Sequence, residues 1–258
     1  MLTRTFRAAL LALVPSVLGG ANYSQHFDNN GPVQSGADGP QNLINQGWIF
    51  RNQSAPLGSG TWFTGYNSWF PPQAGAGYLA VDSSSTDYFG GDVSQWAILP
   101  ALPGQAAGDT LRFYIRRFDS SNVDTMQVRY SPSGGTNTGS GPNAVGDFTS
   151  LLLDLNPIPL TGWTLVSVPV PGTGRLALRF YVNDACNWAC YASYVGVDEL
   201  TVNQTPPPGP PLPAPGETVH WTMSISPVVL NSDTSIVAGG TVIVDPGVQV
   251  RVQGTATL

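Results

Sequence analysis

The sequence contains no lysine, only two histidines and only two glutamates. The absence of lysine excludes a P-loop phosphate site, a Schiff-base enzyme and a serine–lysine dyad. His26 and His220 lie outside any HExxH or GxSxG motif, which argues against zinc and serine hydrolases. A glycosidase with two carboxylates is not excluded in this way, because the fold sets the separation of such a pair. We therefore expect a non-catalytic protein and keep a carbohydrate-active enzyme as the alternative.

Charge is also scarce: charged residues make up 10% of the chain, and the formal net charge is −6. Without a basic patch, a nucleic-acid partner and an anionic membrane surface are both disfavoured. Aspartate outnumbers glutamate by fourteen to two, and the chain has 30 glycines and 23 prolines. This composition favours strands joined by long loops over helices.

A long apolar run is absent as well. Arg4 and Arg7 precede an apolar stretch at residues 8–18 that is interrupted by Pro15, and small residues follow at 19–21. About 20 apolar residues are needed to span a bilayer, so the stretch is too short for a membrane anchor. We interpret residues 1–21 as a signal peptide that is cleaved near Ala21, with no membrane span after its removal. The mature protein is expected to be secreted or to lie at the cell surface.

The chain has only two cysteines, Cys186 and Cys190, separated by three residues. In an oxidising compartment this spacing predicts a short-loop disulfide. Metal binding by two thiolates alone is disfavoured, because it lacks the other ligands of a tetrahedral site.

Strand-like alternation is what the sequence does contain. In its clearest run, one face carries Leu176, Leu178, Phe180 and Val182, and the other carries Ala177, Arg179 and Tyr181. Such alternation is typical of an antiparallel β-sandwich, in which one face is buried and the other meets water or a second layer. Strands are expected at residues 76–81, 93–99, 110–118, 124–130, 161–170, 176–182 and 194–202, and residues 148–155 could form a strand or a short helix.

The C-terminal part has a different sequence pattern. Residues 205–216 are proline-rich and predict an extended linker, since proline fixes φ and donates no hydrogen bond to a sheet. In residues 217–258, alternating valines are interrupted by Gly239-Gly240 and by the turn at residues 245–247. This segment resembles the opening turns of right-handed parallel β-helix proteins. Because about three such repeats are needed to bury a core, we expect either an incomplete coil or strands that dock on the first domain.

Residues 22–204 resemble the choice-of-anchor J domain, a bacterial extracellular family related to the cleaved-adhesin and MAM-like jelly rolls. The resemblance rests on an ordered set of segments: GAGYLAVDSSS at 75–85, SQWAILPAL at 94–102, LRFYIRR at 111–117, MQVRYSPSG at 126–134 and YVGVDELTV at 194–202. It implies an all-β, antiparallel jelly-roll β-sandwich.

The resemblance also suggests a metal site. A related group of carbohydrate-binding modules holds a structural Ca²⁺ where the first and last strands pair, and Asp28 and Asp198 occupy the corresponding segments here. Carboxylates and loop carbonyls supply the oxygens that such a cation needs. The alternative, left open, is that Asp198 caps a turn through hydrogen bonds to the backbone.

An aromatic-rich segment at residues 61–72 is a candidate ligand surface. Tyr66 and Trp69 could stack on the faces of sugar rings. Alternatively, Trp62 and Phe70 belong to the core and only one or two rings of the segment are exposed.

Together these features predict a secreted or cell-surface, non-catalytic binding or adhesion module whose loops recognise a glycan or a surface protein. Two alternatives are a carbohydrate-binding accessory of a β-helix polysaccharide-degrading enzyme and a structural component of the cell envelope.

Overall fold

A computed structural model of the chain describes residues 21–87, 91–118, 124–159, 162–185, 194–204, 211–222, 228–230, 235–248 and 250–252. The chain divides into two compact units between Asn203 and Gln204. Cys186 and Cys190 lie outside the described residues, as do residues 1–20 of the predicted signal peptide and residues 205–210 of the predicted linker. Within the described part of the chain, no helix has the length and hydrophobicity needed to cross a membrane.

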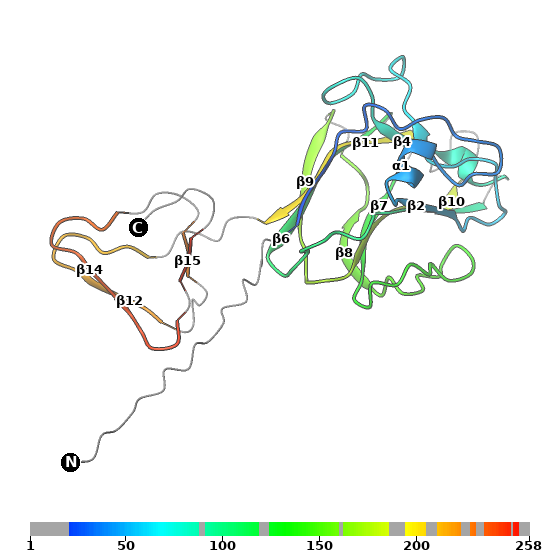
Figure 1. Cartoon of the computed structure of the whole chain (residues 1–258). Coiled ribbons are helices and arrows are strands. Elements are labelled where there is room, and N and C mark those ends of the chain that lie inside the picture. The colour runs from blue at the N-terminus through cyan, green and yellow to red at the C-terminus, as the bar shows by residue number, and fades with distance from the viewer. Residues whose placement is uncertain are drawn as a thin grey trace, which may run out of the picture. The chain divides into compact units, whose positions relative to one another are not determined.

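The first unit consists of two β-sheets that face each other (Figure 1). The first sheet contains β3 (Phe63–Thr64), β4 (Leu79–Asp82), β11 (Tyr194–Gln204), β6 (Asp109–Arg117) and β9 (Thr164–Pro169) in that order, and β1 (Asn22–Gln25) also pairs with β11. The second sheet contains β2 (Ile49–Asn52), β5 (Gly91–Ile98), β10 (Arg175–Ala185), β7 (Met126–Ser131) and β8 (Ser150–Leu155). Two short helices, α1 (Gln41–Asn45) and η1 (Ser83–Ser85), lie in the connections.

The described strand pairs of both sheets are antiparallel, which confirms the predicted all-β jelly-roll sandwich. The seven strands expected from alternation are all present, and their ends differ from the expected ones by three residues or fewer. The ambiguous segment at 148–155 contains β8.

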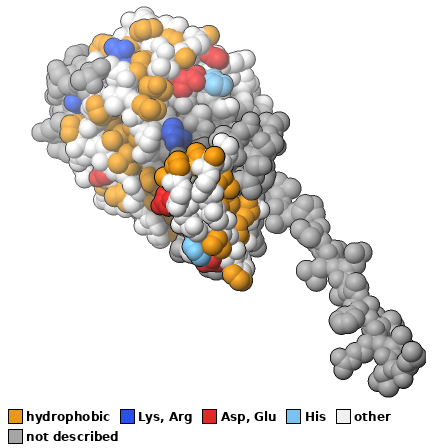
Figure 2. Space-filling view, turned by 90° about the vertical axis from the view of Figure 1, so that its left-hand side faces the viewer, with side chains coloured by type: hydrophobic (Ala, Val, Ile, Leu, Met, Phe, Trp, Pro, Cys, Tyr) orange, Lys and Arg blue, Asp and Glu red, His pale blue; other side chains and the backbone are white. Residues whose placement is uncertain are grey.

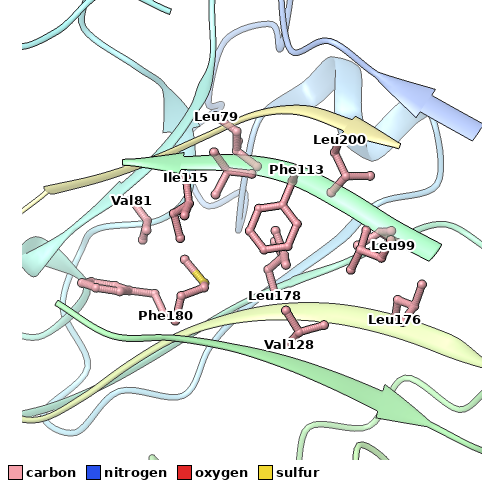
Figure 3. Packing of buried hydrophobic residues seen from close by; sticks show 14 of the residues in the cluster. Leu79, Val81, Leu99, Phe113, Ile115, Val128, Leu176, Leu178, Phe180 and Leu200 are labelled. Atoms are coloured by element: carbon pink, nitrogen blue, oxygen red, sulfur yellow. The ribbon is translucent and has the colours of Figure 1, made fainter. Parts of the chain in front are cut away.

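The main core fills the space between the sheets (Figure 3). Leu178 and Phe180 of β10 point from the second sheet toward Phe113 and Ile115 of β6 in the first sheet, and all four side chains are fully buried. Each such side chain contributes about 1.5–3 kcal/mol to folding through removal of apolar surface from water. The alternation of the sequence is therefore the signature of this core.

Strand β11 changes partner along its length. Val197 pairs with Leu79 of β4, whereas Leu200 pairs with Gln25 of β1. Val197 and Leu200 both point into the core although their residue numbers differ by three, an odd number, so one extra residue is accommodated between them. Glu199 absorbs it with a φ of 48°, in the left-handed region.

The outer face of the second sheet is covered in part by the segment that connects β7 to β8. Phe148 of this segment packs against Trp96 of β5 with ring centroids 5.3 Å apart. The carbonyl of Pro142 accepts a hydrogen bond from Arg179 of β10, whose side chain is 1% exposed. Figure 2 shows that charged side chains on the visible face are few and scattered, as the composition requires.

The second unit contains parallel strand pairs. β12 (Thr218–Trp221) pairs with β14 (Thr241–Val244), and β13 (Val228–Leu230) pairs with β15 (Val250–Val252). Thr218 pairs with Thr241, 23 residues on, and Val228 pairs with Val250, 22 residues on. The chain therefore returns beside itself with a nearly constant period, which is the geometry of a parallel coil.

Candidate functional site

Three exposed aromatic rings gather over the outer face of the first sheet. Tyr66 and Trp69 come from the loop that follows β3, and Phe118 follows the last residue of β6. Their exposed fractions are 55%, 45% and 45%. The Trp69 ring lies 4.5 Å from that of Phe118, centroid to centroid, and 4.7 Å from that of Tyr194. We call Tyr66, Trp69 and Phe118 the aromatic platform.

A turn presents two of these rings. The backbone N–H of Trp69 donates a hydrogen bond to the carbonyl of Tyr66, 3.0 Å away, and closes the turn. Asn67 and Ser68 form its tip and are exposed. The turn thus combines apolar faces with hydrogen-bonding groups, the pairing that sugar recognition requires.

A second aromatic layer supports the platform from below. It consists of Phe63, Phe70, Tyr78, Trp163 and Tyr194, and it is separate from the core between the sheets. The stack is dense: Phe70 lies 5.0 Å from Tyr78 and 5.4 Å from Trp163.

Two tyrosine hydroxyls fix the loop on this layer. The backbone N–H of Tyr66 donates to the hydroxyl of Tyr194 at 2.8 Å, and the hydroxyl of Tyr78 donates to the carbonyl of Tyr66 at 2.9 Å. The two hydroxyl oxygens are 3.0 Å apart. Burial raises the pKa of both tyrosines, so both hydroxyls keep their protons at neutral pH and remain donors.

Two glycines allow the backbone to approach the rings of the supporting aromatic layer closely. A Cβ at Gly65 would lie 2.0 Å from the ring of Tyr78, and a Cβ at Gly196 would lie 2.9 Å from Phe70, Trp163 and Tyr78. Further along the loop, the indole N–H of Trp163 donates to the carbonyl of Pro71 at 2.9 Å. The platform therefore sits on a rigid base.

The structure separates the residues of segment 61–72 into two groups. Trp62 and Phe70 are buried, at 0% and 2% exposure, while Tyr66 and Trp69 remain accessible. Phe118 was not among the site residues predicted from the sequence. The alternation of β6 could have indicated it. Leu111 and Ile115 face the core, so even-numbered positions of the strand face outward, and Phe118 continues this series one residue after the strand ends.

Asp28 and Asp198 bind the same loop. Oδ2 of Asp198 accepts the backbone N–H of Gln73 at 2.8 Å, and Oδ1 accepts that of Glu199 at 2.8 Å. Oδ1 of Asp28 accepts the backbone N–H of Ala76. Burial raises the pKa of Asp198 to about 6, and the hydrogen bonds from the backbone oppose this rise. These backbone contacts are those of the turn-capping alternative.

The calcium site stays a prediction. The amide oxygen of Asn30 is buried without a hydrogen-bond partner, while its Nδ2 donates to the carbonyl of Tyr78 at 3.1 Å. This oxygen and the carboxylates of Asp28 and Asp198 are of the kind that Ca²⁺ binds. Among the described residues, no group of three or more His, Cys, Asp or Glu side chains is placed to hold a metal ion.

A polar cavity of about 370 Å³ lies on the second sheet. Its lining includes Gln127, Asp154, Asn156, Tyr181 and Asn183. The guanidinium of Arg179, two residues earlier in β10, covers one face of the Tyr181 ring, 4.0 Å from the ring centroid. The cavity is a second place where hydroxyl-rich ligands could be bound.

No known family profile matches the sequence. No curated protein matches it either. Among solved structures, the K2 cleaved adhesin domain of Lys-gingipain is similar with a TM-score of 0.51 and 18% identity, over 71% of this chain and 99% of that domain. The K1 domain from Porphyromonas gingivalis W83 has a TM-score of 0.48 and 18% identity, over 72% and 99%. A carbohydrate-binding module of the β-sandwich superfamily has a TM-score of 0.41 and 11% identity, over 63% and 59%. The chain therefore contains a cleaved-adhesin-like fold.

Proposed function

We propose that the first unit is a non-catalytic module that binds glycans through the aromatic platform of Tyr66, Trp69 and Phe118. The observation that supports this most directly is that large aromatic rings remain accessible side by side while the residues beneath them are buried and hydrogen-bonded. Exposed apolar rings cost solvation free energy, so a rigidly held group of them is typical of a ligand surface.

Rigidity is central to the proposal. The loop that carries Tyr66 and Trp69 is held by the Tyr78 and Tyr194 hydroxyls, so little conformational entropy remains to be lost when a ligand binds. The rings would stack on the C–H faces of pyranose rings, and the polar side chains of Asn67 and Ser68 would form hydrogen bonds with hydroxyl groups.

Both histidines contact carboxylates at the surface. His26 lies 2.8 Å from Glu199, and His220 lies 3.0 Å from Asp245.

For the whole protein we infer secretion through the predicted signal peptide, and we infer that the second unit is the start of a parallel β-helix. The parallel pairs with a period of 22–23 residues favour this interpretation. They also favour a second candidate function, in which the module delivers a β-helix polysaccharide-degrading enzyme to its substrate.

A glycan array tests the proposed function. Trp69→Ala and Tyr66→Ala are each expected to lower the affinity for the preferred glycan by about two- to ten-fold, since each removes a ring whose stacking contributes about 0.5–1.5 kcal/mol. Leu165→Ala removes an exposed apolar side chain from β9 of the same sheet and serves as the control.

Two outcomes would contradict the platform. Unchanged binding in both aromatic variants, with loss of binding in Asn183→Ala, would move the ligand to the cavity on the second sheet. Absence of glycan binding, together with binding to a surface protein that Trp69→Ala abolishes, would replace the glycan by a protein ligand.

A further inference from the structure

A buried carboxylate lies at the end of the first sheet, away from the aromatic platform. Asp109, the first residue of β6, is fully buried. Its Oδ2 accepts two backbone N–H groups, from Ala106 at 2.9 Å and from Ala21 at 3.0 Å. Its Oδ1 is buried without a hydrogen-bond partner.

In the part of the chain that the structure describes, the Asp109 carboxylate contacts these two backbone N–H groups and makes no salt bridge to a side chain. An isolated ionised carboxyl group in a protein interior is strongly disfavoured, because it loses its hydration without gaining a counter-ion. A positive charge beside the Asp109 carboxyl group would therefore be strongly favourable.

The backbone nitrogen of Ala21 is the group in position to carry that charge. Ala21 is 2% exposed and its methyl group belongs to the main core. Strand β1 begins at the next residue, where Asn22 pairs with Asn203 of β11. Ala21 is therefore part of the folded unit, and its contacts hold its backbone nitrogen beside Asp109.

We propose that the signal peptide is removed between Gly20 and Ala21, and that the new α-ammonium group of Ala21 forms a buried ion pair with Asp109. The proposal rests on the predicted signal peptide, not on glycan binding. It places the cleavage one residue earlier than the boundary inferred from sequence.

The chemistry is peptide hydrolysis by a signal peptidase. Water adds its oxygen to the carbonyl carbon of Gly20, the C–N bond to Ala21 breaks, and the released amine of Ala21 takes up a proton at neutral pH. An amide nitrogen has one hydrogen and no charge, whereas the ammonium has three donors and a full positive charge. One of the additional N–H groups can donate a hydrogen bond to the unpartnered Oδ1 of Asp109. Cleavage precedes folding, because the completed fold buries this nitrogen.

The consequence is that processing stabilises the protein. A chain that begins at Ala21 contains the ion pair, a chain extended by Gly20 contains only the neutral amide, and a chain that begins at Asn22 has lost the donor. Only the first of these neutralises Asp109.

The test compares proteins that begin at Ala21 or at Gly20, released from a fusion partner by a protease that leaves no additional residue. The chain that begins at Ala21 is expected to melt about 5–10 °C higher, because breaking a buried ion pair in a domain of this size has an effect of that order. Asp109→Asn is expected to reduce the difference between the two chains to about 2 °C or less, while the control Asp38→Asn, at an exposed salt bridge, retains it.

N-terminal sequencing of the protein secreted from the full-length gene provides a second measurement, which is independent of whether Asp109→Asn folds. The expected first residue is Ala21. Equal melting temperatures for the two chains, or a mature protein that begins at Asn22 or later, would overturn the proposal.

Discussion

The backbone N–H of Tyr66 donates to the hydroxyl of Tyr194, 2.8 Å away, across 128 residues of sequence. This bond connects the loop that presents the aromatic platform to the central strand of the first sheet. The ring of Tyr194 also stacks against that of Trp69. Tyr194 therefore contacts both the backbone of the loop and one of the exposed rings that the loop carries.

Tyr194→Phe is expected to keep the ring contacts and remove the acceptor. The N–H of Tyr66 then lacks its partner, so the free energy of unfolding should fall by about 1–2 kcal/mol, measured by urea denaturation. Glycan affinity should fall with it, because the loop is less rigid. Tyr66→Phe, which removes an exposed hydroxyl, is the matched control and should leave stability within about 0.5 kcal/mol of the unmodified protein.

Gly196→Ala tests the spacing between the sheet and the supporting aromatic layer. The new Cβ would lie 2.9 Å from three aromatic rings, which must shift to accommodate it. We expect a loss of about 1–3 kcal/mol in stability and weaker glycan binding. Gly172→Ala is the control, since its Cβ meets its nearest neighbour at 3.5 Å. Equal stability of the two variants would show that the aromatic layer is not tightly packed.

Arg179→Lys probes the covered face of the second sheet. The Arg179 guanidinium donates to Ser94 Oγ at 3.0 Å and to Gln127 Oε1 at 3.1 Å, and it lies 4.7 Å from the ring centroid of Trp96. Burial lowers its pKa to about 10, so it remains charged at neutral pH. Lysine cannot reproduce this planar set of donors, and a loss of about 2–4 kcal/mol is expected in denaturant unfolding. Arg51→Lys, at an exposed salt bridge, should cost less than about 1 kcal/mol.

The sequence predicted the long strands well because each of them has one side in the main core, and burial on one side imposes alternation. It did not predict β2 and β3, and it placed Asp28 in the first strand, whereas β1 ends at Gln25 and Asp28 lies in the turn that follows. The strands β1, β2 and β3 span two to four residues and are defined by pairing with β11, β5 and β4, far away in the chain. Short strands carry too few residues for a period to be recognised.

The sequence predicted only part of the candidate site, because local sequence does not show which segments the fold brings together. Composition indicated that segment 61–72 carries several aromatic residues, and Tyr66 and Trp69 are the exposed ones. That Phe118 joins them depends on the order of β4, β11 and β6 in the sheet, which is a property of topology. Alternation placed Arg179 on the face of β10 opposite the core, but its burial results from an irregular covering segment without a periodic signal.

Stability is expected to depend on pH through Asp198. Its carboxyl pKa is about 6 in the folded chain, above the value of about 3.9 in an unfolded one. Between these pH values the folded state binds more protons, so stability falls as the pH rises from about 4 to about 7, by roughly 2–3 kcal/mol. Urea unfolding at several pH values, in the presence of a chelator, measures this slope. Asp198→Asn should remove it, and Asp38→Asn should leave it unchanged.

Calcium is expected to reverse this behaviour if Asp28 and Asp198 hold the ion. A cation that binds only the folded chain stabilises it by mass action, by about 2.7 kcal/mol at one hundred times the dissociation constant, which corresponds to a rise of roughly 5–10 °C in melting temperature. The positive charge would also lower the pKa of Asp198 and remove the loss of stability at neutral pH. Melting curves in calcium and in chelator measure both effects, with Asp28→Ala as the variant that should lose them and Asp38→Ala as its control. Identical curves in calcium and chelator would leave the backbone N–H groups of Gln73 and Glu199 as the partners that account for Asp198.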